Sequence, residues 1–188
     1  LQLFHFYLDN ILRDAEEKKL DALVKVFSQG MFNRMTKLVT TPSTGKQTKA
    51  AAAFCQAYFA VALALTTGKT PAGVSAAYKS QVASEIKKVM NSENALSPFL
   101  GYTEVKYPYS LYRPRGHYSR SERIKRYFRT MMWLQSVPFG TDKPDQLKRA
   151  LLIAHTIGSD PQMKRTYNSM FEPITFLFGE PDNITVMQ

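Results

Sequence analysis

Cysteine is almost missing from this sequence, because Cys55 is the single thiol among 188 residues. One thiol excludes a disulfide within the chain and a zinc cluster built from cysteines. Cys55 lies inside the apolar run Ala50–Leu65, which favours a small buried side chain over a reactive nucleophile. Histidine is also scarce, and His5, His117 and His155 are too far apart in sequence to indicate a metal site. We therefore predict no metal ion.

Several motifs that would identify a reaction are also missing. The sequence contains no glycine-rich dinucleotide loop, Walker-type loop, His-Glu-x-x-His zinc motif or Gly-x-Ser-x-Gly nucleophile motif. It therefore predicts no cofactor, and it leaves open whether the protein is an enzyme.

Long apolar runs are missing too. A membrane-spanning helix needs about 18 or more apolar residues, and the run Ala50–Leu65 is shorter and is interrupted by Gln56. We therefore predict no transmembrane segment within these residues. With 10 prolines and 9 glycines, the chain also has too few of either residue for a disordered or fibrous protein.

Both ends of the sequence follow helical patterns, and it does not begin with methionine. Leu1–Leu12 already has apolar residues at helical spacing, and the last residues resemble the beginning of another helix. We expect residues 1–188 to form a single helical domain that is a fragment of a larger protein. The absence of a signal peptide from this stretch then says little about location.

What the sequence does have is helical periodicity along most of its length. The fold class that it predicts is all-α: an irregular helical bundle or solenoid-like array of about six or seven helices. We expect helices over residues 1–15 and 20–38 (one bent helix or two), 47–66, 71–90, 119–134, 144–157 and from 161 onward, where Pro173 should kink or interrupt the last one. The alanine-rich helix over residues 47–66 should be central and buried.

One long segment, Ala95–Tyr118, has no helical pattern and contains five tyrosines. Its length and aromatic content indicate an ordered loop that packs over the ends of helices. In the helix before it, we expect Glu85 to face water together with Lys79, Lys87 and Lys88.

The richest chemistry lies in Arg113–Arg129, where seven Lys/Arg and one Glu give a local charge of +6 out of +10 for the chain. Ser119 and Glu122 have the spacing of a capping box, so we predict that a helix starts at Ser119. On that helix Ile124 and its neighbours at helical spacing form an apolar face, and Trp133 falls among the cationic residues of the other face.

Three interpretations of this segment remain open. Its arginines could bind an anionic group beside a helix N-terminus, they could clamp the tyrosine-rich loop to the bundle, or they could bind nucleic acid with Trp133 stacking on bases. The last is disfavoured because the charge is local. The candidate ligand-binding residues are Arg113, Arg115, His117, Tyr118, Arg120, Glu122, Arg126 and Arg129.

An enzymatic interpretation would use Glu122 or Asp9 as acid or base and His117 as a proton shuttle. Glu122 suits this role poorly, because it is placed to cap the helix and to pair with Arg126 four residues later. His5 and Asp9, also four residues apart, are secondary candidates, and a structural hydrogen bond between them is the simpler expectation. The sequence therefore does not identify catalytic residues.

The segment Tyr107–Trp133, with Pro-Arg-Gly-His-Tyr-x-Arg-Ser-Glu and Lys-Arg-Tyr-Phe-Arg-x-Met-Met-Trp, resembles the hallmark of a large bacterial family, the domain-of-unknown-function family numbered 3160. Leu1–Arg13 looks like the early helix of that family, and Phe171–Glu180 is similar to its Glu-Pro-x-x-Phe-Leu-x-Gly segment. The resemblance therefore spans the chain.

The resemblance implies a longer protein that is exported to the periplasm or cell surface, in some cases as a lipoprotein. It brings no known activity, cofactor or catalytic residue. We expect a binding or scaffold module that takes a small anionic ligand or an acidic glycan and contacts the remainder of its own chain. The alternative is a hydrolase or lyase acting on an acidic glycan, with the remainder of the protein completing the active site.

Overall fold

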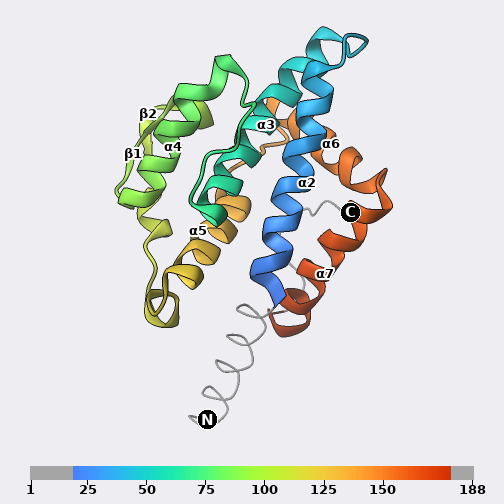
Figure 1. The fold of residues 1–188 in the computed structure, drawn as a ribbon. Helices are drawn as coiled ribbons and strands as arrows, with labels where there is room; N and C mark the ends of the chain where they lie inside the picture. The colour runs from blue at the N-terminus through green and yellow to red at the C-terminus, as the bar shows by residue number, and fades with distance from the viewer. Residues whose placement is uncertain (1–18, 179–188) are drawn as a thin grey trace.

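The structure is a computed structural model that describes residues 19–178. Over this range it has six α-helices and one short β-hairpin (Figure 1), so the all-α prediction is confirmed. The helices are α2 (Asp21–Thr40), α3 (Lys46–Thr67), α4 (Lys79–Asn91), α5 (Glu122–Ser136), α6 (Pro144–Gly158) and α7 (Pro161–Phe178). The hairpin consists of β1 (Ala95–Ser97) and β2 (Tyr102–Tyr107), and 3-10 turns η2 (Ala76–Tyr78), η3 (Pro98–Leu100), η4 (Tyr109–Tyr112) and η5 (Gly116–Ser119) occupy the connections.

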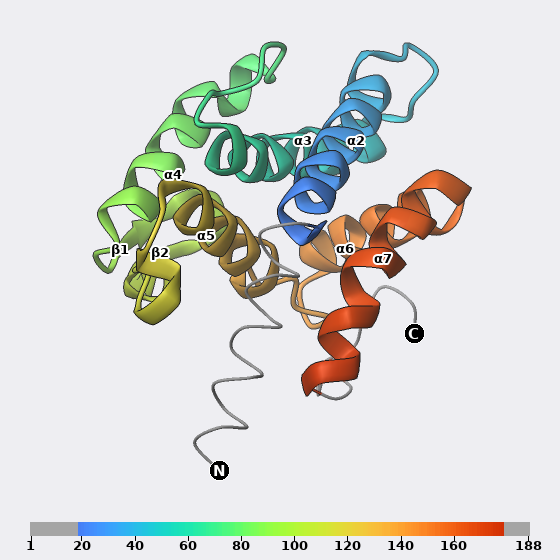
Figure 2. The same ribbon diagram turned by 60° about the horizontal axis from the view of Figure 1, so that its bottom comes forward.

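Helix α3 is the centre of the fold, as its alanine content predicted. Every residue from Phe54 to Thr66 is buried, and α3 contacts α2, α4, α5 and α6. Figure 2 shows α4, α5 and the hairpin on one side of the α2–α3 pair and α6 and α7 on the other. By length and composition α3 could cross a membrane, but 78% of its apolar window is buried inside this fold, as expected for a core helix.

The helix predicted to begin at Pro71 begins later, at Lys79. The preceding residues are held by a buried amide of α3: Gln56 Nε2 donates to the Gly73 carbonyl at 3.1 Å, and the Ser75 N–H donates to Gln56 Oε1 at 3.0 Å. Gly73 has a φ of 82°, which favours glycine and breaks a helix. These hydrogen bonds outweigh the Thr-Pro start signal.

The segment Ala95–Tyr118, predicted to be irregular, contains the β-hairpin. Strands β1 and β2 pair antiparallel with Ala95 opposite Tyr107 and Ser97 opposite Tyr102, and the register shifts between these pairs. Gly101, with a φ of 85°, lies in the turn. The interior of β2 is exposed at four successive residues, so it lacks the alternation of apolar and polar residues by which a sequence indicates a strand.

The C-terminal helix begins at the predicted position and is joined to α2. Asp160 caps α7, because its Oδ1 accepts hydrogen bonds from the N–H groups of Gln162 and Met163 at 2.9 and 3.1 Å. The same carboxylate pairs with Arg34 of α2, and this pairing lowers the pKa of Asp160. Helix α7 continues through Pro173 to Phe178 rather than being interrupted there. The helix predicted over residues 1–15 lies outside the described residues.

Candidate functional site

The basic segment is positioned by η5 and by the start of α5. Helix α5 begins at Glu122 and is capped by Ser121, whose Oγ accepts a hydrogen bond from the Ile124 N–H at 3.2 Å. The predicted start at Ser119 was wrong, because α5 begins later, at Glu122. Ser119 belongs to η5, and its Oγ donates to the Gly116 carbonyl at 2.7 Å. Glu122 is therefore the first helical residue instead of the third, and it cannot complete a capping box.

The tyrosine-rich loop is packed, as predicted, and tyrosines rather than arginines hold it. Tyr107, Tyr109 and Tyr112 are each at most 2% exposed. The hydroxyls of Tyr107 and Tyr112 lie 3.1 Å apart, and both lie within 3.0 Å of Ser136 Oγ on α5. Burial raises the pKa of all three tyrosines. The loop is thus fixed to α5 by buried neutral hydroxyls.

Glu85 of α4, predicted to face water, is 1% exposed. Its carboxylate accepts hydrogen bonds from the Ser97 hydroxyl at 2.9 Å, from Lys88 Nζ at 2.9 Å and from the Tyr109 hydroxyl. The pattern of α4 placed Glu85 among lysines on the outer face, but the hairpin and η4 cover that face. Glu85 is a buried anchor for the tyrosine-rich loop that sequence reasoning missed.

Trp133, predicted to lie on the cationic face of α5, is fully buried. Its Nε1 donates to the Tyr58 carbonyl of α3 at 3.0 Å. The buried residues of α5 follow a spacing of three, Ile124, Tyr127, Thr130 and Trp133, because this row packs on α3, where Thr130 Oγ1 lies 3.2 Å from Thr66 Oγ1. The helical spacing in the sequence had placed the buried face of α5 too far from Trp133.

Three of the predicted arginines, Arg113, Arg115 and Arg120, lie exposed around η5, just before α5. Among them, Arg113 donates a hydrogen bond from Nη2 to the Ser92 carbonyl at 3.4 Å. Within residues 19–178 no carboxylate pairs with any of the three. We call Arg113, Arg115 and Arg120 the arginine surface.

His117 and Tyr118 lie between the arginine surface and the apolar side of α5. Both are half-buried, and their ring centroids are 3.8 Å apart. The Tyr118 ring also contacts Phe128 of α5, with centroids 4.7 Å apart. The contact between Tyr118 and Phe128 packs η5 against α5. The backbone around η5, which carries the arginine surface, is therefore anchored to the helix.

The remaining predicted residues lie along α5 and have partners of other kinds. Glu122 pairs with Lys125 at 2.7 Å rather than with Arg126, and this hydrogen bond lowers the pKa of Glu122. The Arg126 guanidinium lies against Gly68, the left-handed C-cap of α3, where a cation complements the helix dipole. Arg129 is half-buried, its Nε has no hydrogen-bond partner in the described part of the chain, and desolvation lowers its pKa.

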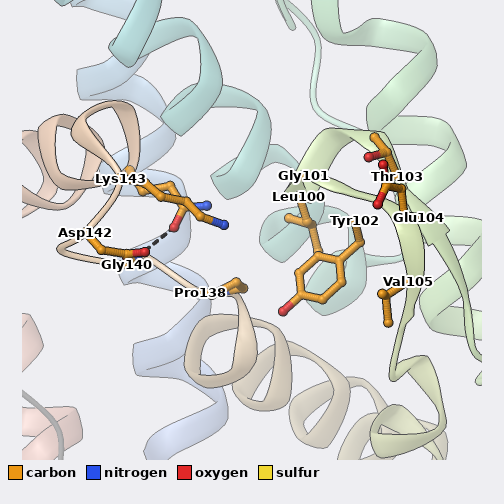
Figure 3. Close-up of a pocket in the computed structure, with 11 residues that line it drawn as sticks. Leu100, Gly101, Tyr102, Thr103, Glu104, Val105, Pro138, Gly140, Asp142 and Lys143 are labelled. Atoms are coloured by element: carbon orange, nitrogen blue, oxygen red, sulfur yellow. Dashed lines mark hydrogen bonds between the residues drawn. The ribbon is translucent and has the colours of Figure 1, made fainter.

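A cleft of about 430 Å³ opens elsewhere, between the hairpin and the start of α6 (Figure 3). One wall runs from Leu100 to Val105, and the other is formed by the connection between α5 and α6 and by the first turn of α6. Tyr102 extends from the first wall toward Pro138 on the second, as Figure 3 shows. None of the predicted site residues lines this cleft.

The secondary candidates His5 and Asp9 lie outside the described residues. Among residues 19–178 no three His, Cys, Asp or Glu side chains gather closely enough to hold a metal ion. The single thiol, Cys55, is buried, as expected, and desolvation raises its pKa to about 12. A thiol with such a pKa is a poor nucleophile at neutral pH.

Comparison with known proteins places the chain without assigning it an activity. No curated protein and no solved structure matches it. A family model described as "Protein of unknown function (DUF3160)" matches residues 1–188, the whole chain, so this protein belongs to that family.

Proposed function

We propose that this chain is a binding module whose arginine surface binds an acidic glycan. The observation that supports this proposal is the exposure of Arg113, Arg115 and Arg120 around one anchored turn, without carboxylate partners in the described part of the chain. Three cations held apart from carboxylates repel one another. A bound polyanion relieves that repulsion.

The alternative role, a clamp for the tyrosine-rich loop, fits these arginines less well. The loop is held by buried tyrosine hydroxyls, Ser136 and Glu85. Other residues of the basic segment do have structural partners, since Arg123 pairs with Asp21 of α2 at 2.7 Å and Arg126 covers Gly68. Within residues 19–178 the arginine surface has one side-chain hydrogen bond, from Arg113 to the Ser92 carbonyl, and no ion pair.

The exposure of the arginines favours an extended polyanion over a small anion in a pocket. An exposed ion pair contributes only about 0–1 kcal/mol, so one small anion on such a surface would bind weakly. A polymer with regularly spaced negative charges can contact several arginines at once, and the individual contributions then combine through effective concentration.

Among polyanions, the buried aromatic residues favour a glycan over nucleic acid. Binding to single-stranded nucleic acid commonly uses exposed aromatic rings on which bases stack. Trp133, Tyr107, Tyr109 and Tyr112 are all buried, so these rings are not available for stacking. An acidic glycan of the bacterial envelope would also suit the exported location that the family resemblance led us to expect, and we keep that location as part of the proposal.

The hydrolase or lyase alternative has less support at this surface. It would use Glu122 as acid or base and His117 as a proton shuttle, whereas Glu122 is exposed and bonded to Lys125 and His117 packs on Tyr118. The cleft beside the hairpin contains neither residue.

The test is binding of the 188-residue chain to polygalacturonate, a uronic acid polymer, measured by affinity electrophoresis. We expect the triple variant R113Q/R115Q/R120Q to lose about tenfold in affinity, because three charge contacts of a few tenths of a kcal/mol to 1 kcal/mol are removed together. Neutral dextran should not bind to the parent protein.

The matched control is K148Q/K164Q/R165Q, which removes three exposed positive charges from α6 and α7, across the α2–α3 pair. We expect this variant to retain most of the affinity. Equal losses in the two triple variants would mean that net charge alone attracts the polymer, and the proposal would then be wrong. If the parent protein bound single-stranded DNA more tightly than polygalacturonate, and the triple arginine variant lost that binding, the ligand of the arginine surface would be nucleic acid rather than a glycan.

A further inference from the structure

The cleft between the hairpin and α6 has walls whose polar side chains are held in place. The Tyr102 ring packs edge-on against Tyr107, with centroids 5.0 Å apart and an interplanar angle of 74°. On the opposite wall, Gln146 Oε1 accepts a hydrogen bond from the Gly140 N–H at 2.7 Å, as the dashed line in Figure 3 shows. This bond fixes the amide so that its Nε2 donor remains available.

Gly140 lies close to two polar side chains of the second wall. A Cβ at this position would lie 2.6 Å from Asp142 Oδ1 and 3.0 Å from Gln146 Oε1. A side chain at this position would push the ends of the Asp142 and Gln146 side chains from their present places. With glycine there, both polar groups lie side by side at the cleft.

The charge of the cleft is opposite to that of the chain. Glu104 lies on the hairpin wall, and Asp142 and Lys143 lie on the other, so the formal charges sum to −1 in a chain of +10. A polyanion that suits the arginine surface would be repelled here. We therefore expect the two places to bind different chemical groups.

Apart from Gln146 Oε1, the polar groups named for the cleft walls make few contacts with the rest of the fold. In the described part of the chain, no hydrogen bond or ion pair engages the Tyr102 hydroxyl, the Glu104 carboxylate, the Lys143 ammonium or Gln146 Nε2. Together they offer acceptors, donors and one group that can do both. A ligand with many groups that both donate and accept would satisfy them.

We infer that this cleft binds an uncharged saccharide unit. Each sugar hydroxyl both donates and accepts hydrogen bonds, which suits a cleft that mixes carboxylates, an amide and an ammonium. The C–H face of a pyranose can pack on an aromatic ring, and Tyr102 supplies one that is half-buried and held edge-on. The volume of about 430 Å³ falls in the range of small-molecule sites.

The experiment is saturation-transfer NMR and titration of the 188-residue chain with four neutral disaccharides: maltose, cellobiose, lactose and N,N′-diacetylchitobiose. We expect saturable binding of at least one at millimolar concentration. Two variants then locate the site. Gln146→Glu keeps an acceptor for the Gly140 N–H but removes the amide donor, and should weaken binding about tenfold, the effect of one lost hydrogen bond. Glu104→Gln keeps an acceptor oxygen but removes its charge, and should weaken binding about fivefold, because a hydrogen bond to a charged group is stronger than one to a neutral group.

Glu93→Gln, an exposed carboxylate outside the cleft, and the triple arginine variant should bind the disaccharide as the parent does. Those results would also separate this inference from the proposed function. The inference fails if no disaccharide binds saturably, or if binding is equal in the parent, Gln146→Glu and Glu104→Gln proteins. It also fails if spermidine binds instead and Glu104→Gln weakens it, because the cleft would then be a site for cationic amines.

Discussion

Three hydrogen-bond donors converge on Glu85, a carboxylate that is 1% exposed. They come from Lys88 on the same helix, from Ser97 at the end of β1 and from Tyr109 in η4. A buried charge is costly unless it is paired and hydrogen-bonded, and here both conditions are met. One side chain thus ties α4 to the hairpin and to the tyrosine-rich loop.

Glu85→Ala should lower the free energy of unfolding by about 3 kcal/mol, because it leaves buried donors without an acceptor. Urea unfolding followed by circular dichroism measures the loss. Glu93→Ala, at an exposed carboxylate, is the matched control and should stay within about 0.5 kcal/mol of the parent. A loss for Glu85→Ala as small as that of the control would mean that the network does not stabilise the fold.

Glu85 and Trp133 also show where sequence reasoning fails at single residues. The helical pattern of α4 and α5 correctly predicted that both segments are helices, but it assigned both side chains to the polar face. A pattern on one helix cannot show how many neighbours cover it, and here the hairpin and α3 cover the sides that composition marked as polar. The basic segment was singled out from its local charge, but the sequence left three interpretations of it open, and the structure shows which of its arginines are exposed. The cleft was missed, because it joins residues some 40 positions apart that share no motif.

At the scale of elements, the start of α5 is set by Ser121 rather than by Ser119, the cap predicted from the sequence. Ser121→Ala should cost about 1 kcal/mol of stability, because the Ile124 N–H loses its acceptor. Ser119→Ala should cost less, since Ser119 Oγ only donates to an exposed carbonyl of η5. Thermal unfolding of the two variants side by side would compare them, and a larger loss for Ser119→Ala would restore the predicted capping box.

Elements with strong local signals were predicted well, and elements set by distant contacts were not. The centre of the fold, α3, follows from its small and apolar residues, and α7 begins at its Asp-Pro signal. The predicted start of α4 was wrong, because Gln56, about 20 residues earlier, forms hydrogen bonds with the backbone of Gly73 and Ser75. The hairpin was missed because its ordering comes from Tyr107, Tyr109 and Glu85 rather than from strand alternation.

At the scale of the whole molecule, buried acids that are neutral at pH 7 should make the protein sensitive to alkali. Burial raises the pKa of Cys55 to about 12 and raises the pKa values of Tyr58, Tyr107, Tyr109 and Tyr112. In the unfolded chain, cysteine and tyrosine lose their protons near pH 8.5 and 10. Above those values the unfolded state binds fewer protons than the folded state, so the free energy of unfolding must fall as pH rises.

Each such group should contribute a slope of up to about −1.4 kcal/mol per pH unit above its unfolded pKa. With a typical total stability of about 5–15 kcal/mol, we expect cooperative unfolding in moderate alkali, measurable by urea titrations at intervals from pH 7 to 11. Cys55→Ala should flatten the plot of unfolding free energy against pH just above pH 8.5, because the thiol is the first of these buried groups to ionise in the unfolded chain. At neutral pH the plots for the variant and the parent should be parallel. If the parent protein kept constant stability from pH 8 to 11, these hydroxyls and the thiol could not be buried as the fold requires, and the tyrosines could not be what holds the loop beneath the arginine surface.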